Sequence, residues 1–196
     1  MCIRDRSTSA RAITFSPDGT TLLTGDRDGM VRVSGARSGR LVRTLRGHTE
    51  AITALVFSTD GALLATASVD GAMRLWDGHA GAPRATLHGH DGEVRSLVFS
   101  PDHARLFTVG ANGVARAWST DDGRLSGLLR WRGERAREGQ VAADGLHAAV
   151  VYAEGAAELV DLDPVAAWRS GCAILRDGPI WRDRPRLRDA CAGASP

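Results

Sequence analysis

A chain of 196 residues can bury a hydrophobic core, and its 43% hydrophobic and 24% charged residues are typical of a globular protein. The formal net charge of +2 gives no strong attraction to nucleic acid or membrane surfaces, and no apolar run approaches the ~20 residues that span a bilayer. The N-terminus carries charges where a secretion signal needs an apolar stretch, and the three cysteines form no metal-binding motif, so we expect a cytoplasmic protein without metal or cofactor.

A segment of 42 residues recurs along this sequence without a gap. Its clearest marker is the pentapeptide Phe-Ser-Pro-Asp-Gly, which begins at Phe15 and returns in altered form at Phe57 and Phe99. Several markers in one register indicate a true internal repeat. The further markers at this spacing are Asp28-Gly29, Asp70-Gly71 and Asn112-Gly113, Gly47-His48 and Gly89-His90, Trp76 and Trp118, and, in a degenerate fourth copy, Glu154-Gly155 and Val160-Asp161.

Each copy predicts four short β-strands. In the second copy, an apolar run at 51–57 is followed by a Ser-Thr-Asp-Gly turn and by a second apolar run at 62–67. An Asp-Gly pair then predicts a tight turn into an alternating strand at 73–76, and a more polar strand follows at 84–87. The continuous apolar character of the first strand indicates a sheet that is covered on both faces.

The sequence resembles WD40 repeat proteins in two stretches, GHTEAITALVFSTDGALLATASVDGAMRLWD (47–77) and GHDGEVRSLVFSPDHARLFTVGANGVARAWS (89–119). The resemblance implies an all-β fold of the WD40 β-propeller type. About four blades of four antiparallel strands are expected, in an open arc that is part of a larger ring. The first copy lacks Gly-His and has Ser34 in place of Trp, so it is partial. The predicted blades are 10–46, 47–88, 89–130 and 131–163.

Both ends of the chain depart from the repeat. Residues 1–9 fit neither the repeat nor a natural start, and we expect them to be an artefact of sequence assembly. Asp163-Pro164, followed by apolar residues at helical spacing, predicts a short helical tail over 164–196. This tail resembles the ends of large bacterial WD40-array proteins, and the complete absence of Lys also favours a bacterial source. The resemblance implies that the chain is a C-terminal fragment.

In WD40 proteins a His, a Thr or Ser, an Asp and a Trp form a hydrogen-bonded tetrad inside the blade. The indole N–H can only donate, so a buried Trp needs an acceptor such as a hydroxyl. The hydroxyl expected from the resemblance is that of Thr66, and Ser68, two residues later on the same strand face, could supply it instead. The alternative is that His48 and Asp70 are a general base and its orienting acid, but catalytic pairs do not recur in every repeat. Matching by position, the resemblance implies tetrads of His48, Thr66, Asp70 and Trp76 and of His90, Thr108, Asn112 and Trp118. The second network is expected to be weaker, because Asn112 removes the carboxylate charge.

The resemblance implies a non-enzymatic scaffold that binds a protein or peptide partner through the loops at one end of its blades. The alternative is the sensor or regulatory part of a larger bacterial signalling enzyme, an ATPase, kinase or protease, whose catalytic domain lies elsewhere. Arg-rich stretches at 130–138 and 180–189 suggest nucleic-acid binding as another function. The acidic residues interspersed in both stretches favour a solvated surface instead. No catalytic motif, small-molecule substrate or membrane association is predicted. The candidate partner-binding residues are Arg27, Thr49, Glu50, Val69, Asp91, Glu93 and Ala111.

Overall fold

Four antiparallel β-sheets follow one another in the computed structural model, which describes residues 9–112, 114–130, 136–141, 147–152 and 157–161. In each sheet, the order of the strands in space is their order in the chain. The four sheets are named blades 1 to 4. Blade 1 comprises β1 (Ala12–Phe15), β2 (Thr21–Gly25), β3 (Val31–Gly35) and β4 (Leu41–Leu45); blade 2 comprises β5 (Ile52–Phe57), β6 (Leu63–Ser68), β7 (Met73–Asp77) and β8 (Pro83–Leu87). Blade 3 comprises β9 (Val94–Phe99), β10 (Arg105–Gly110), β11 (Val114–Ser119) and β12 (Leu125–Arg130); blade 4 comprises β13 (Ala136–Val141), β14 (His147–Tyr152) and β15 (Ala157–Asp161).

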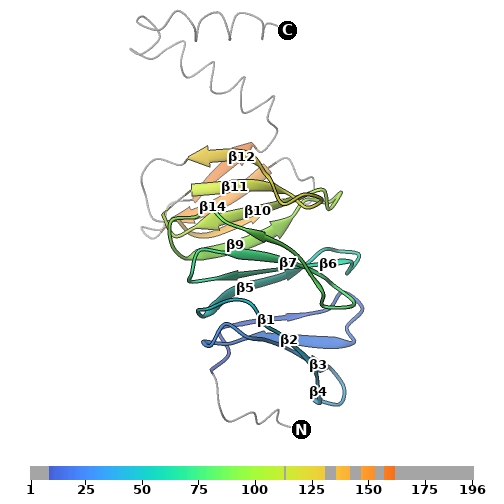
Figure 1. Ribbon diagram of the computed structural model, residues 1–196. Helices are drawn as coiled ribbons and strands as arrows, with labels where there is room; N and C mark the ends of the chain where they lie inside the picture. Colours follow the sequence, from blue (N-terminus) through green and yellow to red (C-terminus); the bar gives the residue numbers. More distant parts are fainter. Residues whose placement is uncertain (1–8, 113, 131–135, 142–146, 153–156, 162–196) are drawn as a thin grey trace, which may run out of the picture.

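The blades stack as an open arc (Figure 1), in which the first strands β1, β5 and β9 contact one another in turn. This architecture confirms the predicted all-β propeller type, with four-stranded blades 1 to 3 and three described strands in blade 4. The described residues contain no helix, and hence none that could cross a membrane. The predicted helical tail and residues 1–8 lie outside the described part of the chain.

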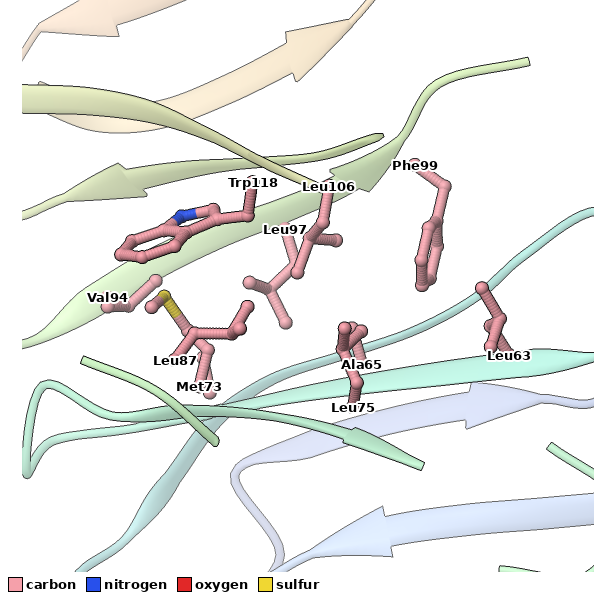
Figure 2. Close-up of a cluster of buried hydrophobic side chains, with 11 residues drawn as sticks. Leu63, Ala65, Met73, Leu75, Leu87, Val94, Leu97, Phe99, Leu106 and Trp118 are labelled. Carbon is pink, nitrogen blue, oxygen red and sulfur yellow. The ribbon is translucent and has the colours of Figure 1, made fainter. Parts of the chain in front are cut away.

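The hydrophobic core lies between the blades rather than within any one of them. Strand β5 shows why: Leu55 and Phe57 pack toward blade 1, while Ala54 and Val56 pack toward blade 3. Because successive side chains of a strand point to opposite faces, a strand covered on both faces is apolar throughout. Figure 2 shows the core between blades 2 and 3, where the labelled residues are Leu63, Ala65, Met73, Leu75, Leu87, Val94, Leu97, Phe99, Leu106 and Trp118.

The first turn of each blade is built by the recurring Phe-Ser-x-Asp sequence. In blade 2, the Ser58 hydroxyl donates to the Asp60 carboxylate and accepts the amide of Leu63 at 2.9 Å, while Asp60 accepts the amide of Ala62 at 3.0 Å. Blades 1 and 3 repeat the Ser–Asp bond in the same turn. The turn ends on Gly61 with φ +73°, a left-handed conformation that glycine adopts without steric cost.

In blade 3, His103 occupies the position of this turn glycine and keeps the left-handed conformation, with φ +58°. A side chain other than glycine is strained there. The imidazole reaches back to blade 2, where Nε2 lies 2.6 Å from Thr59 Oγ1 and Nδ1 lies 3.2 Å from the Asp60 carboxylate. His103 therefore links two neighbouring blades from a strained turn.

Candidate functional site

A chain of hydrogen bonds crosses the interior of blade 2 from Trp76 to His48. The Trp76 indole donates to Thr66 Oγ1 at 2.9 Å, and the same oxygen lies 2.8 Å from His48 Nε2. Thr66 is fully buried and Trp76 is 3% exposed. The indole N–H takes one acceptor site of Thr66. The Asp70 carboxylate beside Nδ1 favours the imidazole proton on that nitrogen, so that the Thr66 hydroxyl donates to Nε2.

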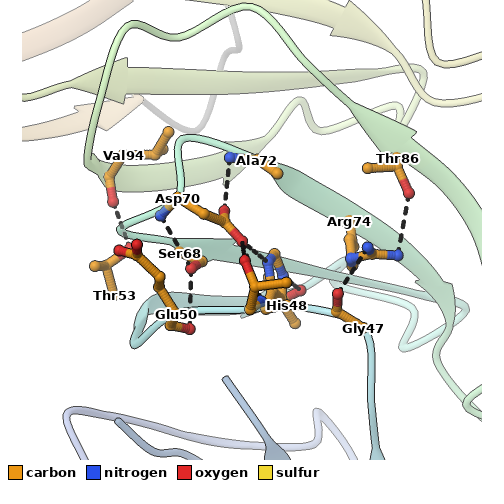
Figure 3. A network of polar contacts seen from close by, with 12 residues as sticks. Gly47, His48, Glu50, Thr53, Ser68, Asp70, Ala72, Arg74, Thr86 and Val94 are labelled. Carbon is orange, nitrogen blue, oxygen red and sulfur yellow. Dashed lines mark hydrogen bonds and ion pairs between the residues drawn. The ribbon is translucent and has the colours of Figure 1, made fainter. Parts of the chain in front are cut away.

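The Asp70 carboxylate completes this arrangement at its edge. His48 Nδ1 faces Asp70 Oδ2 at 3.6 Å, a distance longer than a hydrogen bond, so the link between them is chiefly electrostatic. Asp70 bonds instead to the amides of Ala72 (2.9 Å) and Thr49 (3.2 Å) and to the Thr49 hydroxyl (3.2 Å). Figure 3 shows Asp70 between the Ala72 amide and the His48 ring.

These surroundings move both pKa values downward. Burial lowers the pKa of His48, outweighing the nearby Asp70 carboxylate, so the imidazole is neutral at pH 7. Partial burial acts to raise the pKa of Asp70, but the amides of Ala72 and Thr49 donate to its carboxylate and lower the pKa overall. A neutral imidazole whose side chain is 1% exposed has no access to a substrate in solvent.

Ser68 does not replace Thr66 in this network. Its hydroxyl donates to the carbonyl of Glu50 at 3.0 Å and accepts the amide of Asp70 at 3.2 Å. The Val69 amide donates to the carbonyl of Ala51 at 2.9 Å. The turn between β6 and β7 is thus fastened to the loop that precedes β5.

Blade 3 keeps the Trp–Thr–His bonds but changes the partner of the histidine. Trp118 donates to Thr108 Oγ1 at 2.9 Å, which lies 2.7 Å from His90 Nε2. The residue at His90 Nδ1 is Arg116, whose Nη1 lies 2.8 Å away, while Asn112 accepts the amide of Val114 at 3.2 Å. The Arg116 guanidinium lies at Nδ1 of His90, as the Asp70 carboxylate does at Nδ1 of His48 in blade 2, and the part of Asn112 in this tetrad stays a prediction.

A guanidinium donor at Nδ1 requires a lone pair on that nitrogen, so the proton of His90 lies on Nε2 and is donated to Thr108. The Thr108 hydroxyl proton is directed in turn to the carbonyl of Arg116 at 3.4 Å. The two blades thus hold opposite histidine tautomers. Burial first, and then the Arg116 charge, lower the pKa of His90 to about 4.

An Arg recurs at the same register in three blades, and we did not single it out from the sequence. Arg74 donates to the carbonyl of Gly47 at 2.8 Å and to Thr86 at 3.2 Å, as Figure 3 shows. Arg32 pairs with the buried Asp26 in blade 1, and Arg116 contacts His90 in blade 3. The 42-residue spacing of these residues is the signal that could have found them.

The loops at this end of blades 1 and 2 surround an open hollow of about 500 Å³. Four of the seven predicted contact residues line it, Arg27 from the β2–β3 turn, Thr49 and Glu50 from the loop before β5, and Val69 from the β6–β7 turn. Arg11 and Ala51 complete the lining, and neither was predicted. The hollow is therefore built by residues of two adjacent blades.

The other three predicted residues lie one blade further along the same end. Asp91 is exposed, Glu93 pairs with Arg95 at 3.5 Å, and the Ala111 amide donates to the carbonyl of Glu93 at 2.8 Å. None of the three lines the hollow. The loops of blades 2 and 3 meet at Gly71, where a Cβ would lie 2.9 Å from the carbonyl oxygen of His90.

A second, smaller hollow of about 210 Å³ lies at the opposite end of blades 1 and 2, where no contact residue was predicted. Its charged lining residues are Asp18, Arg43 and Asp60, with His79 beside them. Bonds from the Ser16 side chain and from Thr20 lower the pKa of Asp18 to about 2. The Asp60 carboxylate accepts the Ser58 hydroxyl and lies beside the His103 imidazole. The carboxylates of Asp18 and Asp60 are therefore already bonded within their own turns, and Asp60 also contacts the next blade.

The fold and the polar networks define an arc of a β-propeller in which buried His–Thr–Trp bonds stabilise blades 2 and 3. The chain belongs to the WD40 family: the family model "WD domain, G-beta repeat" matches residues 3–33, 39–77 and 81–119, which is more than half of the chain. The second and third matches each run from the last strand of one blade through the third strand of the next, so each repeat connects two blades. WD40 propellers are typically non-enzymatic and generally bind proteins or peptides.

Similar proteins were found both by sequence and by structure. A 32-residue segment is 59% identical to mitochondrial division protein 1 of Saccharomyces cerevisiae strain YJM789, and equally to that of strain ATCC 204508 / S288c. The segment is 16% of this chain and spans only 4% of the length of those relatives. The crystal structure of the computationally designed Ika4 protein matches with a TM-score of 0.72 and 21% identity, over 82% of this chain and 95% of that chain. This last likeness concerns the fold alone.

Proposed function

We propose that this chain is a non-enzymatic interaction module that binds a protein or peptide partner at the end of blades 1 to 3 carrying the hollow. The observation that carries the proposal is the shared hollow itself, lined by Arg27, Thr49, Glu50 and Val69 from two blades. An open hollow lined by charged, polar and apolar side chains on a rigid scaffold suits the binding of a peptide segment. Asp91, Glu93 and Ala111 extend this contact face along blade 3.

The tetrad residues support this surface from below. Asp70 accepts bonds from the amide and hydroxyl of Thr49, and the nearby Ser68 donates to the carbonyl of Glu50, so these two residues fix the loop that lines the hollow. His48 itself lies inside the blade and does not line the hollow. This placement supports a structural role for His48 and Asp70 over a catalytic one.

The test is selection of peptides from a random display library by the purified chain, followed by measurement of their binding to Val69→Arg. The long side chain introduced there would occupy the hollow, so selected peptides should lose most of their affinity. Ala80→Arg is the matched control, because Ala80 is exposed in the β7–β8 turn at the other end of blade 2. Equal affinity of both variants for all selected peptides, or the absence of any selected peptide, would overturn the proposal.

We further propose that blade 1 packs against another propeller blade, as part of a larger ring. Ile13 and Phe15 are 66% and 59% exposed, whereas the residues one repeat later, Leu55 and Phe57, pack into the core against the preceding blade. Exposed apolar faces of this kind mark interaction surfaces. A bacterial source, a cytoplasmic location and a regulatory role within a larger signalling enzyme stay predictions.

A further inference from the structure

We infer that the hollow between blades 1 and 2 recognises an acidic side chain, Asp or Glu, of a peptide segment. This inference rests on the proposed function and adds the chemistry of the partner. Its basis is the charge that lines the hollow: among the residues that the structure describes, Arg11 and Arg27 are the cationic lining residues and Glu50 is the one acidic lining residue. The lining therefore carries a net positive charge, although the whole chain is close to neutral.

The two arginines reach the hollow from different elements. The Arg11 amide donates to the carbonyl of Gly25 at 2.8 Å, which holds Arg11 at the start of β1, beside the end of β2. Arg27 follows two residues after that strand end, in the exposed β2–β3 turn. Both side chains are exposed and, among the described residues, neither makes an ion pair. Two guanidinium groups at one hollow are well suited to a carboxylate, which each can bind through paired N–H donors.

The acids closest to Arg27 in the sequence leave its charge available. Asp26 is 1% exposed, and its carboxylate is occupied by Arg32 and by the amides of Asp28 and Met30 at 2.9 and 3.0 Å. Asp28 is exposed on the turn but does not line the hollow. The buried acid thus shapes the turn that presents Arg27, and it is neutralised from the inside of the blade.

The other residues that line the hollow predict which residues flank the acidic residue in the bound peptide. Ala51 and Val69 give an apolar surface, and the bond between the Val69 amide and the Ala51 carbonyl holds it in place. Glu50 is exposed and has no ion pair among the described residues, so it repels a second acid and favours a basic one. The preferred segment therefore places an acidic residue at the arginines, an apolar residue at Val69 and a basic residue at Glu50.

The experiment uses the full chain and the peptides selected from the random library. The selected sequences should be enriched in Asp or Glu, and replacing that acid by Gln should weaken binding about tenfold or more, the effect of losing one charge-assisted hydrogen-bonded pair. Arg27→Glu and Arg11→Glu should each weaken binding of the acidic peptide similarly, and peptides in which Lys replaces the acid should regain affinity for these variants. Arg37→Glu is the control, because Arg37 is exposed in the β3–β4 turn at the opposite end of blade 1.

The outcomes separate the inference from the function on which it rests. Peptides that lose affinity for Val69→Arg but show no acid preference and no response to Arg11→Glu or Arg27→Glu would overturn the inference and leave the interaction module standing. Failure to select any peptide that depends on Val69 would overturn both. An acid preference with equal losses in Arg37→Glu and Arg27→Glu would reveal general attraction to a basic chain and would also overturn the inference.

Discussion

Thr66 holds the blade 2 network together, because its single hydroxyl oxygen contacts both the Trp76 indole and the His48 imidazole. Thr66→Val keeps the shape of the side chain but leaves two buried polar groups without partners, so we expect a loss of about 2 kcal/mol or more in the free energy of unfolding. Urea denaturation measures this loss. Thr86→Val is the control, since Thr86 is exposed and its partner Arg74 can bind water instead. Similar losses in the two variants would contradict the assigned role.

The buried histidines predict how stability depends on pH. Burial lowers the pKa of His48, and burial with the Arg116 charge lowers that of His90 to about 4, whereas the unfolded chain titrates near the ordinary value of 6.5. Between pH 6.5 and 4, the unfolded state binds protons that the folded state does not, so stability decreases as the pH decreases through this window. The lowered pKa of Asp18 contributes only below its ordinary value of 3.8.

His90→Gln should reduce this pH dependence by about one proton, because one histidine no longer titrates between the two states. The measurement is the free energy of unfolding in urea at several pH values from 7 to 4.5, compared with the unaltered chain. His79→Gln, at an exposed position, is the control. An unchanged slope for His90→Gln would show that this imidazole is protonated as easily in the folded chain as in the unfolded one.

The resemblance to WD40 proteins implied a His, a Thr and a Trp in the networks of blades 2 and 3, but it gave no indication of Arg116 beside His90. In the strand register, the recurring Arg of blades 1 and 2 pairs with a Thr on the last strand, Thr44 or Thr86, whereas Arg116 pairs with Leu128. Arg116 lies beside His90, while Asn112 accepts the amide of Val114 in its own turn. The contact between Arg116 and His90 joins β11 to the loop before β9, and position-by-position matching of repeats does not reveal it.

At the scale of the structural element, the first turn of blade 3 combines strain with a contact between blades. His103→Ala removes the bonds to Thr59 and Asp60 but keeps a side chain in the left-handed conformation, so we expect a loss of about 1 kcal/mol. His103→Gly removes the same bonds and the strain together, so its stability should lie closer to that of the unaltered chain. Thermal unfolding of both variants measures the difference.

The matched change on the other side of this contact is Asp60→Asn, which weakens the pairing with His103 without altering the turn glycine of blade 2. Equal destabilisation by His103→Ala and His103→Gly would mean that the left-handed conformation costs little here. The turn itself was predictable, because Ser, Asp and Gly recur in it. The contact between blades was not, because it depends on how closely two successive turns approach.

At the scale of the whole molecule, the exposed face of β1 predicts association. Replacing both Ile13 and Phe15 by Glu should abolish concentration-dependent association of the chain, because charged groups are costly to bury in an apolar contact. Sedimentation velocity over a range of concentrations is the measurement. Val42→Glu is the control, because Val42 is similarly exposed, at 58%, but lies on the last strand β4 and not on the first strand β1. A single monomeric species for the unaltered chain at all concentrations would contradict this prediction.

By itself the sequence determined the 42-residue period, the order of strands within a blade and the all-β class. These properties follow from local patterns that a covalent repeat copies at fixed spacing, and strands covered on both faces must be apolar. Only the tertiary structure decided that Arg11 joins Arg27 at one hollow, that Arg116 contacts His90, and that His103 reaches the preceding blade. Such contacts depend on how strands and turns come together in space, which the spacing of residues along the chain does not specify.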